Sequence, residues 1–143
     1  MTNGLAVLVA AIANMVIGFL WYGPLFGKQW TKLMNFDSKK MKEMKNQSMT
    51  KPMILGFISA LVMAYALSYI LDRSRLIFNL LELGALDILH GLFIGFLVWL
   101  GFIVTVLLGT VLWEGKPIRL YLLNISYWLV TLLVMGAILA VWF

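Results

Sequence analysis

The chain of 143 residues has no cysteine, one histidine, six acidic residues and three prolines. The absence of cysteine excludes disulfide bridges and cysteine-ligated metal sites. One histidine and few carboxylates leave little with which to build a metal centre or a hydrolytic active site. We therefore expect no bound metal, no cofactor, no catalytic residue and no enzymatic activity.

Charge is also scarce, whereas apolar residues are abundant. Charged residues make up 12% of the chain, hydrophobic residues 63%, and the mean hydropathy is +0.98. These values exclude a disordered chain and a soluble globular domain, because neither can be this apolar. The sequence predicts a multi-pass membrane protein.

A helix that spans a bilayer needs about 20 mostly apolar residues. Four stretches meet this length, at about 4–22, 52–71, 85–113 and 121–143. They fill most of the chain, so we predict an all-α fold. It has a single integral membrane domain over residues 1–143, with four transmembrane helices in a compact bundle. Residues 1–3 carry no basic side chain, so we interpret the first stretch as a span rather than a signal peptide.

The distribution of Lys and Arg predicts the orientation. The connection 23–51 carries seven lysines, and the connection after the third span carries Lys116 and Arg119. The connection between the second and third spans carries Arg73 and Arg75. Because cytoplasmic loops are enriched in Lys and Arg, the first and third connections face the cytoplasm and both termini lie outside it. We expect the cell inner membrane as the location.

The first connection, 23–51, has its own helical pattern. Phe26, Trp30 and Leu33 recur on one helical face, which is typical of a short amphipathic helix in the headgroup layer. Asp37 or Ser38 is positioned to cap a second, lysine-rich helix. We expect these lysines to contact anionic lipid headgroups, with an acidic partner protein as the alternative. No motif for nucleic-acid recognition is present, and we expect no nucleic acid as a partner.

The second connection, 72–84, is short and rich in leucine. We expect Leu76, Ile77, Leu80, Leu81 and Gly84 to form an interfacial turn on the outer side of the membrane.

Small residues recur at every fourth position in three of the spans. Transmembrane helices associate through such close-packing stripes, so the stripes predict a tight bundle. Gly91 and Gly95 also form a pattern found in helix dimers. Such stripes can also pack helices within a single chain. We nevertheless expect a homo-oligomer. The stripes are Ala6, Ala10, Asn14 and Gly18 in the first span, Gly56, Ala60, Ala64 and Ser68 in the second, and Gly101, Thr105 and Gly109 in the third.

Few polar side chains lie within the predicted spans, and each is a candidate for function. Asp87 and His90 share a helix face at the outer end of the third span, where a helix N-terminus favours a carboxylate without further function. A cation entry point or a proton relay is the functional alternative. Asn14, Thr105 and Thr131 lie near the middles of three spans. They either line a narrow solute path or form hydrogen bonds between helices.

A second set of candidates lies at the predicted cytoplasmic face. Pro24 cannot continue a regular helix and also restricts Gly23 before it. Glu114 lies in a turn closed by Gly115 and Pro117, and could pair with a lysine of the first connection. We interpret these motifs as structural turns. An inner gate or a binding site for a partner protein is the functional alternative. The candidates at this face are Trp21, Tyr22, Gly23, Pro24, Trp30, Glu114 and Asn124.

The same motifs carry a resemblance to a known family. Over essentially its whole length the chain resembles the family called domain of unknown function 1761. The resemblance implies a small bacterial membrane protein with four spans, and it implies no activity. In that family a serine commonly stands where this chain has Gly23. The matching residues are the run Trp21-Tyr22-Gly23-Pro24-Leu25-Phe26-Gly27-Lys28, Trp30, the run Glu114-Gly115-Lys116-Pro117, Asn124, Tyr127 and Trp128.

Two functions follow from these patterns. A small homo-oligomeric channel or transporter for an ion or small solute fits the compact spans and the polar residues near their middles. A membrane scaffold or accessory subunit, which binds anionic lipid or a partner through the basic connection, fits the uncharged core. The sequence favours the conduit narrowly over the scaffold.

Overall fold

The computed structural model describes residues 2–81 and 87–142, and of Asp87 it describes only the backbone. The regular structure within these ranges is helical. Within these ranges no strand occurs, so the all-α prediction is confirmed. In chain order the elements are α1 (Gly4–Leu20), a π-helical segment (Trp21–Leu25), α2 (Gly27–Leu33), α3 (Ser38–Asn46), α4 (Thr50–Leu80), α5 (Asp87–Val98), a second π-helical segment (Trp99–Val104), α6 (Thr105–Leu112) and α7 (Ile118–Val141).

Four helical stretches are long and apolar enough to cross a membrane, as predicted. They are Gly4–Leu25, Thr50–Leu80, Ile88–Leu112 and Ile118–Val141. The first includes the π-helical turn, and the third consists of α5, the second π-helical segment and α6. The molecule therefore has the helices of a membrane protein.

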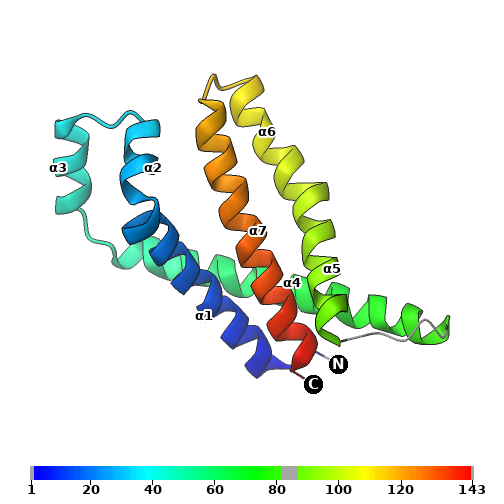
Figure 1. Ribbon diagram of the computed structural model, residues 1–143. Coiled ribbons are helices and arrows are strands. Elements are labelled where there is room, and N and C mark those ends of the chain that lie inside the picture. Colours follow the sequence, from blue (N-terminus) through cyan, green and yellow to red (C-terminus); the bar gives the residue numbers. More distant parts are fainter. Residues whose placement is uncertain (1, 82–86, 143) are drawn as a thin grey trace.

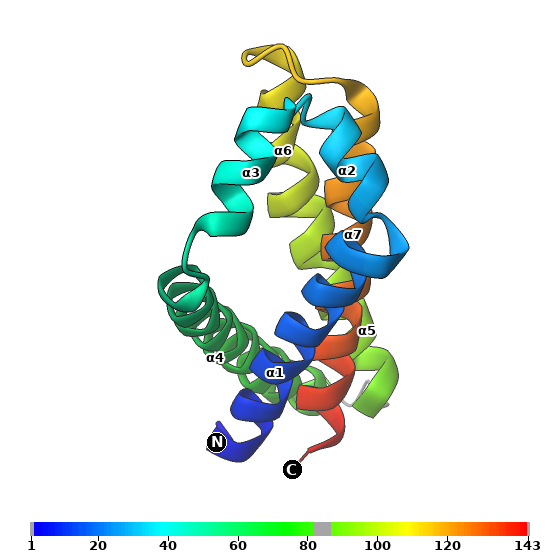
Figure 2. The same ribbon diagram turned by 90° about the vertical axis from the view of Figure 1, so that its left-hand side faces the viewer.

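The spans are arranged as three helices crossed by a fourth. In Figure 1, α1, α7 and the α5–α6 rod run upward beside one another, and α4 crosses behind them at a steep angle. Figure 2 shows the same relation from the side. The chain ends lie together at the lower end, here called the terminal face, whereas α2, α3 and the α6–α7 turn lie at the upper end, here called the lysine face.

Close backbone contact joins α5 to α7. A Cβ atom on Gly91 would lie 2.2 Å from the Gly136 carbonyl oxygen, and one on Gly95 would lie 2.5 Å from the Leu132 carbonyl oxygen. Only glycine permits such an approach, as in other small-residue helix contacts. The pattern of Gly91 and Gly95 therefore packs against α7 of the same chain.

The stripe of small residues on α1 packs against the stripe on α4. Ala6, Ala10, Ala60 and Ala64 are almost completely buried in one core cluster. Small side chains let the two helices approach closely at their crossing. The stripes of α1 and α4 thus serve packing within the chain, whereas Gly101 and Thr105 of the third predicted stripe are exposed.

The helix α4 extends further than the sequence predicted. The turn expected after Leu71 is absent, because α4 continues to Leu80 and the turn begins at Leu81. Neither glycine nor proline interrupts residues 72–81, so the helix has no local reason to stop. Gly84, which was expected in this turn, lies outside the described residues.

Polar contacts hold the end of α4 at the terminal face. The Thr2 hydroxyl donates a hydrogen bond to Asp72 over 3.2 Å. The Arg75 guanidinium donates to the Ala140 carbonyl oxygen near the end of α7. These bonds place residues 72–75 beside the N-terminal end of α1 and the C-terminal end of α7.

Both helices predicted in the first connection are present, and neither spans a membrane. In α3 the Asp37 side chain is the N-cap, and it accepts a hydrogen bond of 2.7 Å from the Lys40 backbone amide. The turn between α6 and α7 has Gly115 at φ +69°, a conformation that favours glycine.

Candidate functional site

A buried hydrogen bond joins the first and last spans near their middles. Asn14 on α1 is 6% exposed, and its side-chain oxygen accepts a hydrogen bond of 2.9 Å from the Tyr127 hydroxyl of α7. The Asn14 amide nitrogen lies 3.9 Å from the Met63 sulfur of α4. Lipid offers no partner to an amide, so burial against other helices is required here. Of the three predicted midplane residues, Asn14 has the clearest polar environment.

Polar contacts continue from Tyr127 toward the lysine face. The Tyr22 hydroxyl donates a hydrogen bond of 2.7 Å to the Asn124 side-chain oxygen. The rings of Tyr22 and Tyr127 meet edge to face, with centroids 5.1 Å apart. Asn124 and Tyr127 lie one turn apart on α7, so a line of polar groups runs from Asn14 to Asn124. We call these four residues the tyrosine–asparagine network.

Aromatic side chains surround the lysine-face end of this network. The Trp21 indole donates a hydrogen bond of 3.2 Å to the Leu123 carbonyl oxygen. The Trp30 ring of α2 packs edge to face against Tyr22 with centroids 5.6 Å apart. Because Pro24 lacks an amide hydrogen, the first span loses regular α-helical bonding at residues 21–25. The π-helical segment turns α2 back over α7, so that Trp30 reaches Tyr22.

The other two midplane candidates do not join Asn14 in one site. Thr131 is fully buried on α7, one turn from Tyr127. Thr105 is exposed, and its hydroxyl donates to the Gly101 carbonyl oxygen of its own span. The neighbouring Val104 carbonyl oxygen accepts a bond of 2.9 Å from Tyr121 in the first turn of α7. Thr105 therefore lies near the lysine face rather than level with Asn14.

The predicted outer candidates lie at the terminal face. His90 is buried, and its Nε2 atom lies 2.8 Å from the Ser74 hydroxyl of α4. Its ring also meets the Phe78 ring edge to face, with centroids 4.7 Å apart. His90 thus joins α5 to α4. Asp87 begins α5, and its side chain lies outside the described part of the chain.

The remaining lysine-face candidates are exposed. A Cβ atom on Gly23 would meet nothing within 4 Å, so there is space for a side chain at this position. Pro24 and Glu114 also face outward. Among residues 2–81 and 87–142, Glu114 makes no ion pair with a lysine of the first connection.

A pocket of about 630 Å³ lies beside the aromatic side chains, between α2 and the first turns of α7. We call it the lysine-face pocket. Its cationic groups come from Lys32 of α2 and Arg119 of α7, whereas Phe26, Leu33 and Leu122 give it an apolar wall. Trp21, Gln29, Leu123 and Ser126 complete the lining.

The resemblance in the sequence is confirmed by a family model that matches residues 5–140. The chain belongs to the DUF1761 family. The description of this family is a protein of unknown function, so membership of DUF1761 assigns no activity and no site residue. No curated protein and no solved structure matches the chain.

Several residues of the site were not singled out from the sequence. Tyr127 entered only as part of the family resemblance, although its spacing from Asn124 places both on one helix face. Trp99 donates a hydrogen bond of 2.7 Å to the Ile125 carbonyl oxygen. An indole N–H inside an apolar span needs a hydrogen-bond acceptor, and this requirement could have singled out Trp99 in the sequence. Nothing in the sequence links Lys32 to Arg119.

Proposed function

We propose that this protein is a non-transporting membrane scaffold that binds an anionic phospholipid at its lysine face. The observation that carries the proposal is the lysine-face pocket, which combines two cations with an apolar wall at one end of the spans. An anionic phospholipid has the matching chemistry, because its phosphate is attached to apolar chains. The cationic groups belong to different helices, so a headgroup between them would also link α2 to α7.

The charges around the pocket favour a phosphate ligand. The Arg119 guanidinium presents a planar set of donors that suits phosphate oxygens, and the Lys32 ammonium adds a point charge. The exposed lysines of α3 extend the positive field on the same face. If this face is cytoplasmic, as the positive-inside rule predicts, it meets the anionic leaflet.

Neutralising the pocket tests this function. We expect the double variant Lys32→Gln, Arg119→Gln to retain about tenfold less phosphatidylglycerol than the unchanged protein, because two charge-assisted contacts are lost. The measurement is native mass spectrometry of protein released from nanodiscs that contain phosphatidylglycerol and phosphatidylcholine.

A second double variant on the same face is the matched control. Lys40→Gln, Lys45→Gln removes the same charge from exposed positions of α3 and leaves the pocket intact. We expect its retention of phosphatidylglycerol to stay within about twofold of the unchanged protein, because exposed charges act through a screened field. An equal loss in both double variants would show that lipid binds the face diffusely, and the pocket proposal would fail.

A conduit for an ion or small solute is a second candidate, favoured by the tyrosine–asparagine network. These polar groups, buried at Asn14 and Tyr127 and half-buried at Tyr22 and Asn124, extend from mid-span to the lysine face, as a solute path would require. In the core cluster, however, Ala10, Ala64 and Met135 are fully buried, so a path needs an opened state or several copies of the chain. A homo-oligomer is therefore part of this candidate.

The conduit is tested with Asn14→Leu. We expect this variant to abolish sodium efflux from proteoliposomes while it still inserts into the bilayer, if Asn14 lines the path. Thr105→Val, which changes an exposed hydroxyl, is the control and should keep the flux unchanged. Equal flux in Asn14→Leu and in the unchanged protein removes Asn14 from any such path.

A further inference from the structure

A second pocket lies on the lysine face, beside the bend where the first span passes into α2. It has a volume of about 520 Å³ and is here called the elbow pocket. Its cationic groups are Lys28 and Lys32 of α2. Tyr22, Phe36 and Met41 line it with aromatic and apolar surface. The elbow pocket therefore combines cations with apolar side chains, as the lysine-face pocket does.

Lys32 belongs to both pockets. On one side of it, Gln29 and Leu33 line the lysine-face pocket. On the other side, Lys28 and Thr31 line the elbow pocket. With about 3.6 residues per helical turn, these two pairs lie on neighbouring faces of α2, and Lys32 lies between them. The two pockets are therefore adjacent and share a cation.

The turn between α2 and α3 supplies the outer wall of the elbow pocket. Asn35 has φ +58°, a left-handed conformation that asparagine adopts more readily than most residues. The chain reverses at this turn, and α3 runs back in the opposite direction to α2 (Figure 1). Phe36 packs edge to face against Trp30, with ring centroids 5.6 Å apart. This contact holds Phe36 in the wall of the pocket.

Both pockets lie where spans end. The first span ends at Leu25 and the last begins at Ile118. Arg119 is therefore in the first turn of the last span, and Lys28 and Lys32 follow the first span within two helical turns. Long basic side chains at the ends of spans extend to the headgroup layer. The cations of both pockets are thus at the depth where lipid phosphates lie.

We propose that the two pockets together bind cardiolipin, an anionic phospholipid with two phosphates. The inference rests on the proposed function and deepens it, because it names the lipid and adds a second phosphate site. One phosphate lies between Lys32 and Arg119, and the other lies beside Lys28. A single glycerol unit links the phosphates of cardiolipin, so both can be contacted from neighbouring turns of α2. Basic pockets between membrane helices suit such headgroups.

The charges favour this lipid over one with a single phosphate. Three cations, Lys28, Lys32 and Arg119, face its two phosphates, and none of the described residues that line the pockets is acidic. Phosphatidylglycerol has one phosphate and can occupy only one of the pockets at a time. Each phosphate of cardiolipin also carries its own acyl chains, and each pocket has its own apolar wall, with Leu33 in one and Phe36 in the other.

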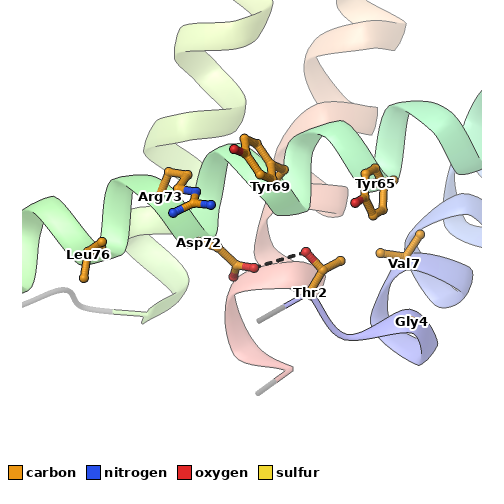
Figure 3. Close-up of a pocket in the computed structure, with 8 residues that line it drawn as sticks. All are labelled: Thr2, Gly4, Val7, Tyr65, Tyr69, Asp72, Arg73 and Leu76. Carbon is orange, nitrogen blue, oxygen red and sulfur yellow. Dashed lines mark hydrogen bonds between the residues drawn. The ribbon is translucent and has the colours of Figure 1, made fainter.

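The pocket at the terminal face has a different charge pattern. It has a volume of about 710 Å³, and Asp72 lines it together with Arg73. Figure 3 shows the Asp72 side chain directed at Thr2, whose hydroxyl donates a hydrogen bond to it over 3.2 Å. Because a carboxylate repels phosphate, this pocket is unsuited to a lipid with two phosphates.

A single substitution in α2 tests the second phosphate site. We expect Lys28→Gln to retain about tenfold less cardiolipin than the unchanged protein, because a charge-assisted contact is lost. Its retention of phosphatidylglycerol should stay within about twofold, because Lys28 acts on the lysine-face pocket only through a screened field. The measurement is native mass spectrometry of protein released from nanodiscs with equal parts of cardiolipin, phosphatidylglycerol and phosphatidylcholine.

Lys39→Gln is the matched control, and Lys28→Arg tests the role of charge. Lys39 is exposed on α3, two positions from Met41 and thus on the other side of that helix from the pocket. We expect Lys39→Gln to leave the retention of both lipids unchanged. Lys28→Arg should retain cardiolipin within about twofold of the unchanged protein, because it keeps the cation. Circular dichroism checks that each variant keeps its helices.

The two lipids separate failure of this inference from failure of the proposed function. If Lys32→Gln, Arg119→Gln retains as much phosphatidylglycerol as the unchanged protein, the proposed function fails. If that variant loses phosphatidylglycerol but Lys28→Gln and Lys39→Gln retain equal cardiolipin, the lysine-face pocket stands and the elbow pocket is not a phosphate site. An equal loss of both lipids in Lys28→Gln, or a loss of cardiolipin in Lys28→Arg as large as in Lys28→Gln, would also overturn the inference.

Discussion

Replacing Gly91 with alanine is expected to push α5 away from α7 and to lower the stability of the protein sharply. The added Cβ atom would lie 2.2 Å from the Gly136 carbonyl oxygen and 2.5 Å from the Ala140 Cβ atom. One of these neighbours is backbone, so a rotamer change cannot relieve the contact and the helices must separate. We expect a loss of about 3 kcal/mol, at the upper end of the range for overpacking. Thermal unfolding in detergent, followed by circular dichroism, measures it.

Gly101→Ala is the matched control for this prediction. Gly101 belongs to the same span and undergoes the same change, but a Cβ atom there meets nothing within 4 Å. Its midpoint of unfolding should equal that of the unchanged protein or lie slightly above it, because alanine favours helix. If both alanine variants unfold at the same temperature, α5 and α7 do not pack through Gly91.

Replacing Tyr127 with alanine is expected to lower the stability at least as much. This side chain bonds to Asn14, and its ring lies 5.1 Å from the Tyr22 ring and 4.9 Å from the Trp128 ring. Removing a buried aromatic ring leaves a cavity, and we expect a loss of about 3–5 kcal/mol. Tyr127→Phe keeps the ring and should lose only about 1 kcal/mol, the contribution of the hydroxyl. Equilibrium unfolding in mixed micelles distinguishes these two losses.

A double-mutant cycle shows whether the hydroxyl acts through Asn14. In an Asn14→Leu background the Tyr127 hydroxyl has lost its acceptor side chain, so Tyr127→Phe should then cost almost nothing. Trp128→Phe, in the same turn of α7, should cost the same in both backgrounds. A full loss for Tyr127→Phe in the Asn14→Leu background would mean that the hydroxyl is stabilised by another group.

Hydropathy and small-residue spacing were sufficient to predict the four spans and the packing faces of α1 and α4. Both signals are local, because they can be read within the sequence of a single helix. The level of Thr105 was not predictable in this way. The relative height of two helices depends on where their backbones meet, and here the contact of Gly91 with Gly136 sets it. Thr105 was misplaced because it lies beyond the midpoint of the third stretch, Ile88–Leu112, on the side of the lysine face.

The candidate site depends on contacts that sequence spacing cannot reveal. Lys32 and Arg119 line one pocket although most of the chain separates them. The end of α4 was also hard to foresee, because charged residues after Leu71 suggested a loop. In the folded protein these charges lie along the terminal face, where Asp72 and Arg75 find partners on other segments. A helix can therefore continue through a charged stretch when its polar side chains find partners on other segments.

The tyrosine–asparagine network also constrains the order in which the chain can be assembled during synthesis. Tyr22 is 102 residues from Asn124 along the chain, and Asn14 is 113 residues from Tyr127. When the ribosome delivers α1 to the bilayer, α7 has not yet been made. The Asn14 amide must meanwhile be hydrated or held by the insertion machinery, because lipid chains offer it no hydrogen bond. The hydrogen bond between Asn14 and Tyr127 can form only after α7 has been inserted, so this polar side chain of the earliest helix gains its partner late in assembly.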